Sequence, residues 1–153
     1  MSTDRLDDLV EGTRISEFTP KTKSGRRLAR IVSVQSLYEF EMTGIDTDVV
    51  SSRLLDKHSI SKGDQLLAKQ ILKTVNQNLN YLDGKISKAA TKFNLSEMSS
   101  IDRNTLRVAV SESLLENPPP KPVIINEAIE VASYLGSDSS GSLINGVLVT
   151  LLM

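Results

Sequence analysis

Residues 68–93 read AKQILKTVNQNLNYLDGKISKAATKF, and their apolar side chains recur at alternating steps of four and three residues. This spacing is the heptad pattern, which keeps one side of a helix apolar and favours the shallow crossing angles of a helical bundle. Gly84 lies inside the pattern, so a bend in this long helix could fall there. The apolar seam consists of Ala68, Leu72, Val75, Leu79, Leu82, Ile86, Ala89 and Phe93.

Two shorter amphipathic segments precede the seam. The first is expected to begin near Ser24 and to end at Gly44, and the second is expected to start after a cap at Asp46. Residues 1–23 are polar, of mixed charge and without a helical or strand period, which predicts a flexible extension. The folded domain is therefore expected over residues 24–153.

Three more helices are predicted after the seam. Ser99 is expected to cap the first of them, and the prolines between 118 and 122 separate it from the second. Gly136 is expected to close that second helix as a left-handed cap, and Gly146 in the last helix predicts close contact between helices. No segment alternates as a strand would. The fold class predicted is all-α with about six to seven helices, for which one hydrophobic core is the default at this length and two small bundles are the outer limit.

Composition excludes several kinds of chemistry. The 153 residues include no cysteine, which removes disulfides, thiolate metal sites and a cysteine nucleophile, and fits a reducing compartment. His58 is the only histidine, and its polar neighbours predict a solvated loop residue and not a catalytic base. No apolar run reaches the roughly 18 residues of a membrane span, and no secretory signal is evident. We expect a cytoplasmic protein that is not an enzyme, without a metal, a cofactor or a membrane contact.

The basic charge of the chain is concentrated in residues 21–30. This segment carries +5 and no acid, which leaves −6 over the remainder of a chain whose net charge is −1. A basic cluster on an otherwise acidic chain indicates a local site for a polyanion. Its members are Lys21, Lys23, Arg26, Arg27 and Arg30.

Three of these basic residues fall at the predicted start of the first helix. Guanidinium groups beside the positive end of the helix dipole suit phosphate, and Tyr38, within about 20° of Arg27 around the helix, could stack on a base. A solvated basic face and a core tyrosine explain the same residues equally simply. From this pattern alone both interpretations stay open.

The same segment resembles a known family. RRLAR at 26–30, followed by VQSLY at 34–38, resembles the opening of the NusB family of transcription antitermination proteins. Further blocks follow in order and extend the resemblance over roughly residues 25–150. They are NYLD at 80–83, IDR at 101–103 with LRVA at 106–109, INEAIEVA at 125–132 and INGVL at 144–148.

The resemblance implies an all-α fold of two small helical bundles packed together, and it implies a function. It implies binding of boxA-type RNA jointly with a small-subunit ribosomal protein, called NusE in this role, within the antitermination complex of RNA polymerase during ribosomal RNA transcription. It also implies a partner-binding site at Asp102 and Arg103, whereas a homodimer remains a further possibility. The RNA-binding residues that it implies are Arg26, Arg27, Arg30, Gln35, Tyr38 and Arg107.

Some observations keep alternatives open. Arg103 and Arg107 are one helical turn apart, a like-charge pair that is mildly destabilising unless Asp102, Glu112 or a ligand lies between them, and an ion pair within the molecule explains Arg107 as well as RNA does. Ser139 and Leu143 stand where the family often carries an acid and an aromatic that help contact RNA. The alternatives are a helical adaptor that binds only protein, and a stand-alone relative of the RNA-binding module of ribosomal RNA methyltransferases.

Overall fold

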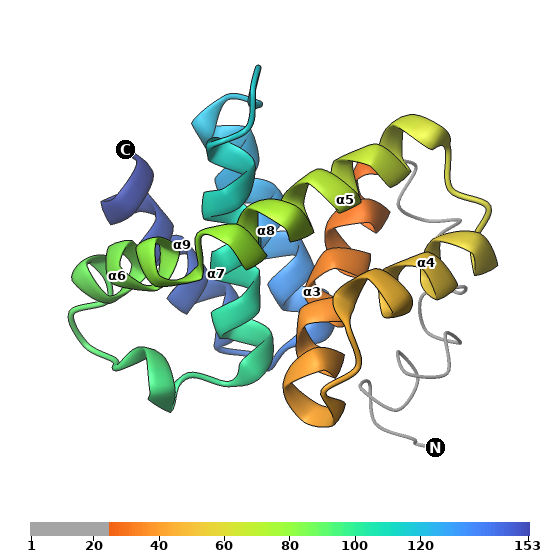
Figure 1. Cartoon of the computed structure of the whole chain (residues 1–153). Coiled ribbons are helices and arrows are strands. Elements are labelled where there is room, and N and C mark those ends of the chain that lie inside the picture. Colours follow the sequence, from red (N-terminus) through yellow and green to blue (C-terminus); the bar gives the residue numbers. More distant parts are fainter. Residues whose placement is uncertain (1–24) are drawn as a thin grey trace. The chain divides into compact units, whose positions relative to one another are not determined.

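The structure is a computed structural model, and the part of the chain that it describes is mainly helical. Residues 25–153 contain seven α-helices and one short 3-10 helix, and no strand occurs among them (Figure 1). The predicted all-α class and its six to seven helices are confirmed, whereas the prediction for residues 1–23 lies outside the described residues. The helices are α3 (Gly25–Thr43), α4 (Thr47–Lys57), α5 (Lys62–Gln77), α6 (Leu79–Ala89), η1 (Leu95–Glu97), α7 (Ser100–Ser113), α8 (Lys121–Leu135) and α9 (Ser140–Leu152).

These helices belong to two compact units, one ending at Gln70 and the other spanning Ile71–Met153, so that the boundary falls within α5. In the first unit α3 packs against α4, and both helices end or begin as their residues predict. Gly44, at φ 78°, ends α3 in the left-handed region. The Asp46 side chain caps α4 by accepting a hydrogen bond of 2.8 Å from the Asp48 N–H.

An ion pair joins the two helices of the first unit. Arg53 of α4 donates from one guanidinium nitrogen to both carboxylate oxygens of Glu39 on α3, at 2.9 and 3.1 Å. The Glu39 carboxylate is almost fully buried while half of the Arg53 side chain is exposed. Removing Arg53 would leave a buried charge behind, so this pair helps to specify how α4 sits on α3.

The heptad seam forms two helices and not one. The bend expected at Gly84 is wrong, because the chain breaks at Asn78, whose φ of −129° and ψ of 26° are not helical. The Asn78 side-chain amide donates to the Thr74 carbonyl at 2.9 Å, and its backbone N–H donates to the same carbonyl at 3.0 Å. The backbone bond is the ordinary helical one, so the side-chain amide adds a second donor to the Thr74 carbonyl and displaces nothing. Most of the seam is buried, but Leu79 and Phe93 are exposed.

In the second unit α7, α8 and α9 pack on one another, and α6 packs on α7 and α9. Ser99 caps α7 as predicted, since its hydroxyl accepts from the Asp102 N–H at 3.1 Å. Pro122 lies in the first turn of α8. No helix within residues 25–153 is both long enough and apolar enough to cross a membrane.

The glycines differ from expectation. Gly136 is extended, with φ −99° and ψ −153°, so the predicted left-handed cap is wrong. Glycine is required here because a larger residue would not fit. An added Cβ would collide with the Ser140 hydroxyl and would lie 2.8 Å from the Ala132 carbonyl oxygen. The close helix contact predicted at Gly146 is also wrong, since nothing lies within 4 Å of a Cβ built there. Gly84 is equally open.

Adding one methyl group at each of these positions should therefore have opposite effects. Gly136→Ala is expected to lower the free energy of unfolding by about 1–3 kcal/mol through overpacking. Gly84→Ala and Gly146→Ala, both in helix interiors, are each expected to raise it by up to about 1 kcal/mol. Urea unfolding followed by circular dichroism measures all three. A destabilised Gly84→Ala together with a neutral Gly136→Ala would contradict this description of the two sites.

His58 is not the solvated loop residue that its neighbours predict. It terminates α4 and is partly buried, and its Nε2 has no hydrogen-bond partner among residues 25–153. Burial, and secondarily the charge of Lys57, lowers the pKa of the His58 imidazole. The lowered pKa favours the neutral imidazole at neutral pH. We therefore interpret His58 as a structural residue at the end of α4.

Candidate nucleic-acid interface

The basic start of α3 reaches the surface through two of its three arginines. Arg26 is exposed and Arg27 is partly exposed, whereas Arg30 is buried, with only 5% of its surface exposed. In the described part of this segment, the basic side chains that reach the surface are therefore those of Arg26 and Arg27. Lys21 and Lys23, the other members of the predicted cluster, lie outside the described residues.

An acid of the same unit lies at the first residue of α3. The Asp64 carboxylate approaches Gly25 so closely that a Cβ on this glycine would collide with it. The Asp64 carboxylate also accepts a hydrogen bond of 2.9 Å from the Ser61 hydroxyl. Because this carboxylate already faces the positive end of the helix dipole, attraction of phosphate at this end depends on the arginine side chains and not on the helix terminus.

Two further predicted residues lie along α3. Gln35 is buried, and Tyr38 is intermediate between core and surface. The partial exposure of Tyr38 fits neither a fully buried core residue nor a fully open stacking platform. Of the five predicted RNA contacts on α3, the structure thus leaves Arg26, Arg27 and part of Tyr38 accessible.

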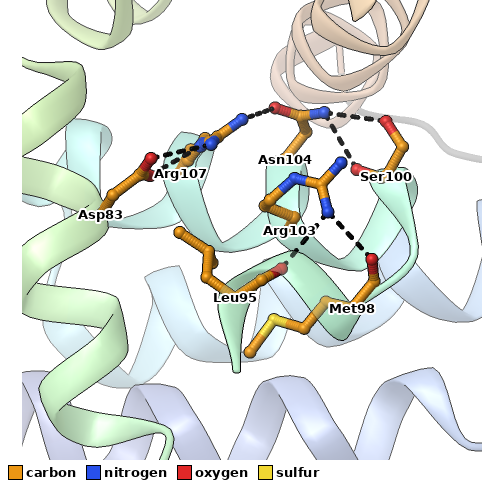
Figure 2. Close-up of polar contacts among 7 residues, drawn as sticks. All are labelled: Asp83, Leu95, Met98, Ser100, Arg103, Asn104 and Arg107. Atoms are coloured by element: carbon orange, nitrogen blue, oxygen red, sulfur yellow. Dashed lines mark hydrogen bonds and ion pairs between the residues drawn. The ribbon is translucent and has the colours of Figure 1, made fainter. Parts of the chain in front are cut away.

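Arg107 is held by an ion pair across two helices. Its guanidinium donates from Nε and from a terminal nitrogen to the two oxygens of Asp83 on α6, each at 2.8 Å (Figure 2). Its other terminal nitrogen donates to the Asn104 side-chain oxygen at 3.0 Å. The side chains of Arg107 and Asp83 are only 11% and 26% exposed. The intramolecular ion pair left open by the sequence is therefore present, with Asp83 as its acid.

Arg103 is held by backbone carbonyls. One of its terminal nitrogens donates to the Met98 carbonyl at 2.9 Å and to the Leu95 carbonyl at 3.3 Å, so it ties α7 to η1 (Figure 2). Asn104 completes the cluster by donating from its side chain to the carbonyl and hydroxyl of Ser100, at 2.9 and 3.1 Å. This polar network fixes the first two turns of α7 relative to its neighbours in the same unit.

The two predicted partner-binding residues, Arg103 and Asp102, line different grooves. Arg103 lines a groove of about 650 Å³ with Arg107, Asp83 and the exposed ring of Phe93. Asp102 lines another groove of about 630 Å³ between the start of α7 and α9, where Ser139 and Leu143 also lie. Asp102 is 8% exposed, and its Oδ1 has no hydrogen-bond partner within residues 25–153. The structure therefore brings Asp102 together with Ser139 and Leu143, and not with Arg103.

Sequence reasoning missed Asp83 and Asn104 as parts of this cluster. Asp83 is 24 residues from Arg107, and nothing in the spacing of the two announces their contact. The only available signal was the like-charge pair of Arg103 and Arg107 on adjacent turns, which suggested a nearby acid but did not identify Asp83.

The described residues thus form an all-helical protein with a basic helix start and two grooves that each combine charged and apolar side chains. A model of the NusB family matches residues 27–152, and the chain belongs to this family. The resemblance found in the blocks from RRLAR to INGVL is thereby confirmed.

Several known proteins are similar to the chain over most of its length. The transcription antitermination protein NusB of Desulfitobacterium hafniense is 36% identical over 125 residues, covering 80% of this chain and 84% of that protein. The NusB protein of Anaeromyxobacter dehalogenans is 38% identical over 127 residues, covering 82% and 88%.

Solved structures with a similar fold include members of the same family. The T. maritima NusB structure has a TM-score of 0.76 and 32% identity, covering 82% of this chain and 89% of that chain. A structure of the antitermination factors NusB and NusE in complex with dsRNA has a TM-score of 0.74, covering 83% and 95%. Its identity is 20%, so that likeness shows the fold alone.

Proposed function

We propose that this chain is a transcription antitermination factor that binds boxA-type RNA together with the ribosomal protein NusE during ribosomal RNA transcription. The observation that carries this proposal is the family match over residues 27–152. The relatives named above are transcription antitermination proteins, and one of the similar folds was solved with NusE and RNA. Such a factor acts on RNA polymerase, in the cytoplasm and without chemistry of its own.

Exposure selects the residues that contact RNA in this proposal. Arg26 and Arg27 bind phosphates through side chains that reach the surface, and the partly exposed Tyr38 lies along the same helix. Arg30 and Gln35 are buried, so they contribute by supporting α3 and not by direct contact. Arg107 acts through its ion pair with Asp83, which positions α7 against α6.

The groove between α7 and α9 is the proposed contact with the ribosomal protein. The Asp102 carboxylate lies at its wall and has one buried oxygen without a hydrogen-bond partner among the described residues. A buried carboxylate with spare acceptor capacity suits a lysine, an arginine or an N–H group of a partner. Because Leu143 and Ser139 offer no ring to stack on a base, RNA affinity at this groove depends more on the partner than on these two side chains.

Titrating boxA-type RNA against the chain with and without the ribosomal protein tests this function. We expect the partner to raise the affinity for boxA-type RNA by at least about tenfold through a joint surface, and a scrambled RNA of the same length to gain less. Equal affinity for the two RNAs, with or without the partner, would contradict the proposal. Binding of the ribosomal protein without RNA binding would favour the helical adaptor.

A further inference from the structure

The outer side of α6 carries cationic side chains to which the proposed function assigns no RNA contact. Tyr81, Lys85 and Lys88 are four and three residues apart, so they lie on one side of the helix. Lys92 continues the series in the segment that follows α6, where it also lines the groove between α7 and α9. All four side chains are exposed, Tyr81 to 53%. We call Tyr81, Lys85, Lys88 and Lys92 the lysine stripe.

The charge of the lysine stripe is not balanced locally. Residues 84–96 contain three lysines and no acid. None of these lysines makes an ion pair with an acid of the described part of the chain. Asp83, the acid of α6, is held on another side of the helix by the bidentate pair with Arg107. The lysine stripe therefore has a net charge of +3 that is available to a ligand.

Aromatic rings and open backbone accompany this charge. The Lys85 ammonium lies 5.7 Å from the centre of the Tyr81 ring, within cation–π range. Phe93, directly after Lys92, is half exposed. Gly84, one residue before Lys85, has nothing within 4 Å of a Cβ position, so a ligand can approach the backbone there. Lysines interleaved with exposed rings are the composition of surfaces that bind single-stranded nucleic acid.

We propose that the lysine stripe is a second RNA contact, which binds the phosphates and unpaired bases of single-stranded RNA outside the boxA segment. This inference rests on the proposed function, because it presupposes that the chain binds RNA at α3. Lysines serve phosphates as point charges without base preference, and exposed rings stack only on bases that are not paired. The contact adds affinity and little sequence selectivity.

The test compares two RNAs with the full-length chain. One is the boxA-type RNA alone, and the other is the same RNA extended on both sides by about ten uridines. Replacing Lys85 and Lys88 together by alanine is expected to weaken binding of the extended RNA about fivefold and to leave binding of the short RNA unchanged; Lys92 is kept because it also lines the groove between α7 and α9. Each lost phosphate contact lowers the log–log salt slope by about 0.7 for a single strand, so this double variant should lower it by about 1.4. Tyr81→Leu should weaken binding of the extended RNA without changing this salt slope.

A matched control separates the lysine stripe from net charge. Lys69 and Lys73 are exposed lysines of α5, and the Lys69→Ala/Lys73→Ala variant should bind both RNAs as the unchanged chain does. Equal losses for this control and for Lys85→Ala/Lys88→Ala would overturn the inference, as would an unchanged affinity of Lys85→Ala/Lys88→Ala for the extended RNA. Loss of ribosomal-protein binding without loss of RNA binding would also overturn it, by identifying a protein surface. If the unchanged chain binds neither RNA, the proposed function itself fails.

Discussion

Replacing Arg26 and Arg27 together by alanine is expected to weaken binding of boxA-type RNA by more than about tenfold, because each side chain is proposed to supply a charge-assisted contact to phosphate. These are the two arginines of the cluster that reach the surface in the described part of the chain. The helix should stay intact, since alanine favours helices and neither residue is buried. Fluorescence titration measures the affinity, and circular dichroism checks the helix content.

Two further variants show what the loss means. Arg26→Lys/Arg27→Lys keeps the charge but loses the planar fork, so it should have an intermediate affinity. The Lys69→Ala/Lys73→Ala chain removes the same charge from another exposed surface and should bind RNA normally. An Arg26→Ala/Arg27→Ala variant that binds boxA-type RNA as tightly as the unchanged chain would contradict the assignment of this surface and favour the adaptor.

Arg107→Ala is expected to lower the free energy of unfolding by about 2–3 kcal/mol, because it leaves the Asp83 carboxylate, which is largely buried, without its partner. This expected loss of stability is low for a broken buried ion pair, because the Asp83 side chain keeps 26% of its surface exposed to water. Arg107 also donates to Asn104 at 3.0 Å, so the polar network at the start of α7 loosens as well. Urea unfolding of the full-length chain measures the change.

A double-mutant cycle isolates the pair itself. Combining Asp83→Ala with Arg107→Ala should cost less than the sum of the two single changes, with a coupling energy of about 1–3 kcal/mol. Lys73→Ala, at an exposed position of α5, should stay within about 0.5 kcal/mol of the unchanged chain. Additive effects of Asp83→Ala and Arg107→Ala would show that the contact in Figure 2 contributes nothing to stability.

Features controlled by neighbouring residues were predictable from the sequence. Asp46 and Ser99 each cap a helix as predicted, because a short oxygen-bearing side chain satisfies an N–H group two or three residues later wherever the helix packs. The break at Asn78 was not predicted, although it too is local. The heptad spacing continues unbroken through Asn78, so the periodicity of the apolar residues gave no sign of the non-helical backbone there.

Features that depend on distant packing were not predictable. Gly136 is needed because the Ser140 hydroxyl lies against it, and not for a left-handed backbone. Periodicity placed Arg27 and Arg30 together at the start of α3, but it could not show that Arg30 is buried. Nor could it show that Asp64, almost forty residues further along, faces Gly25. The candidate site was therefore located by charge and resemblance, while its accessible part emerged only from the structure.

The central claim is that exposed arginines at the start of α3 bind RNA phosphates in a chain that acts with a ribosomal partner. The most direct test is titration of labelled boxA-type RNA into the complex of this chain with that partner, at about 50 and 200 mM salt. We expect saturable binding at the lower concentration that weakens at least about tenfold at the higher one, as counterion release requires. No binding at low salt, or the same affinity at both concentrations, would contradict the claim.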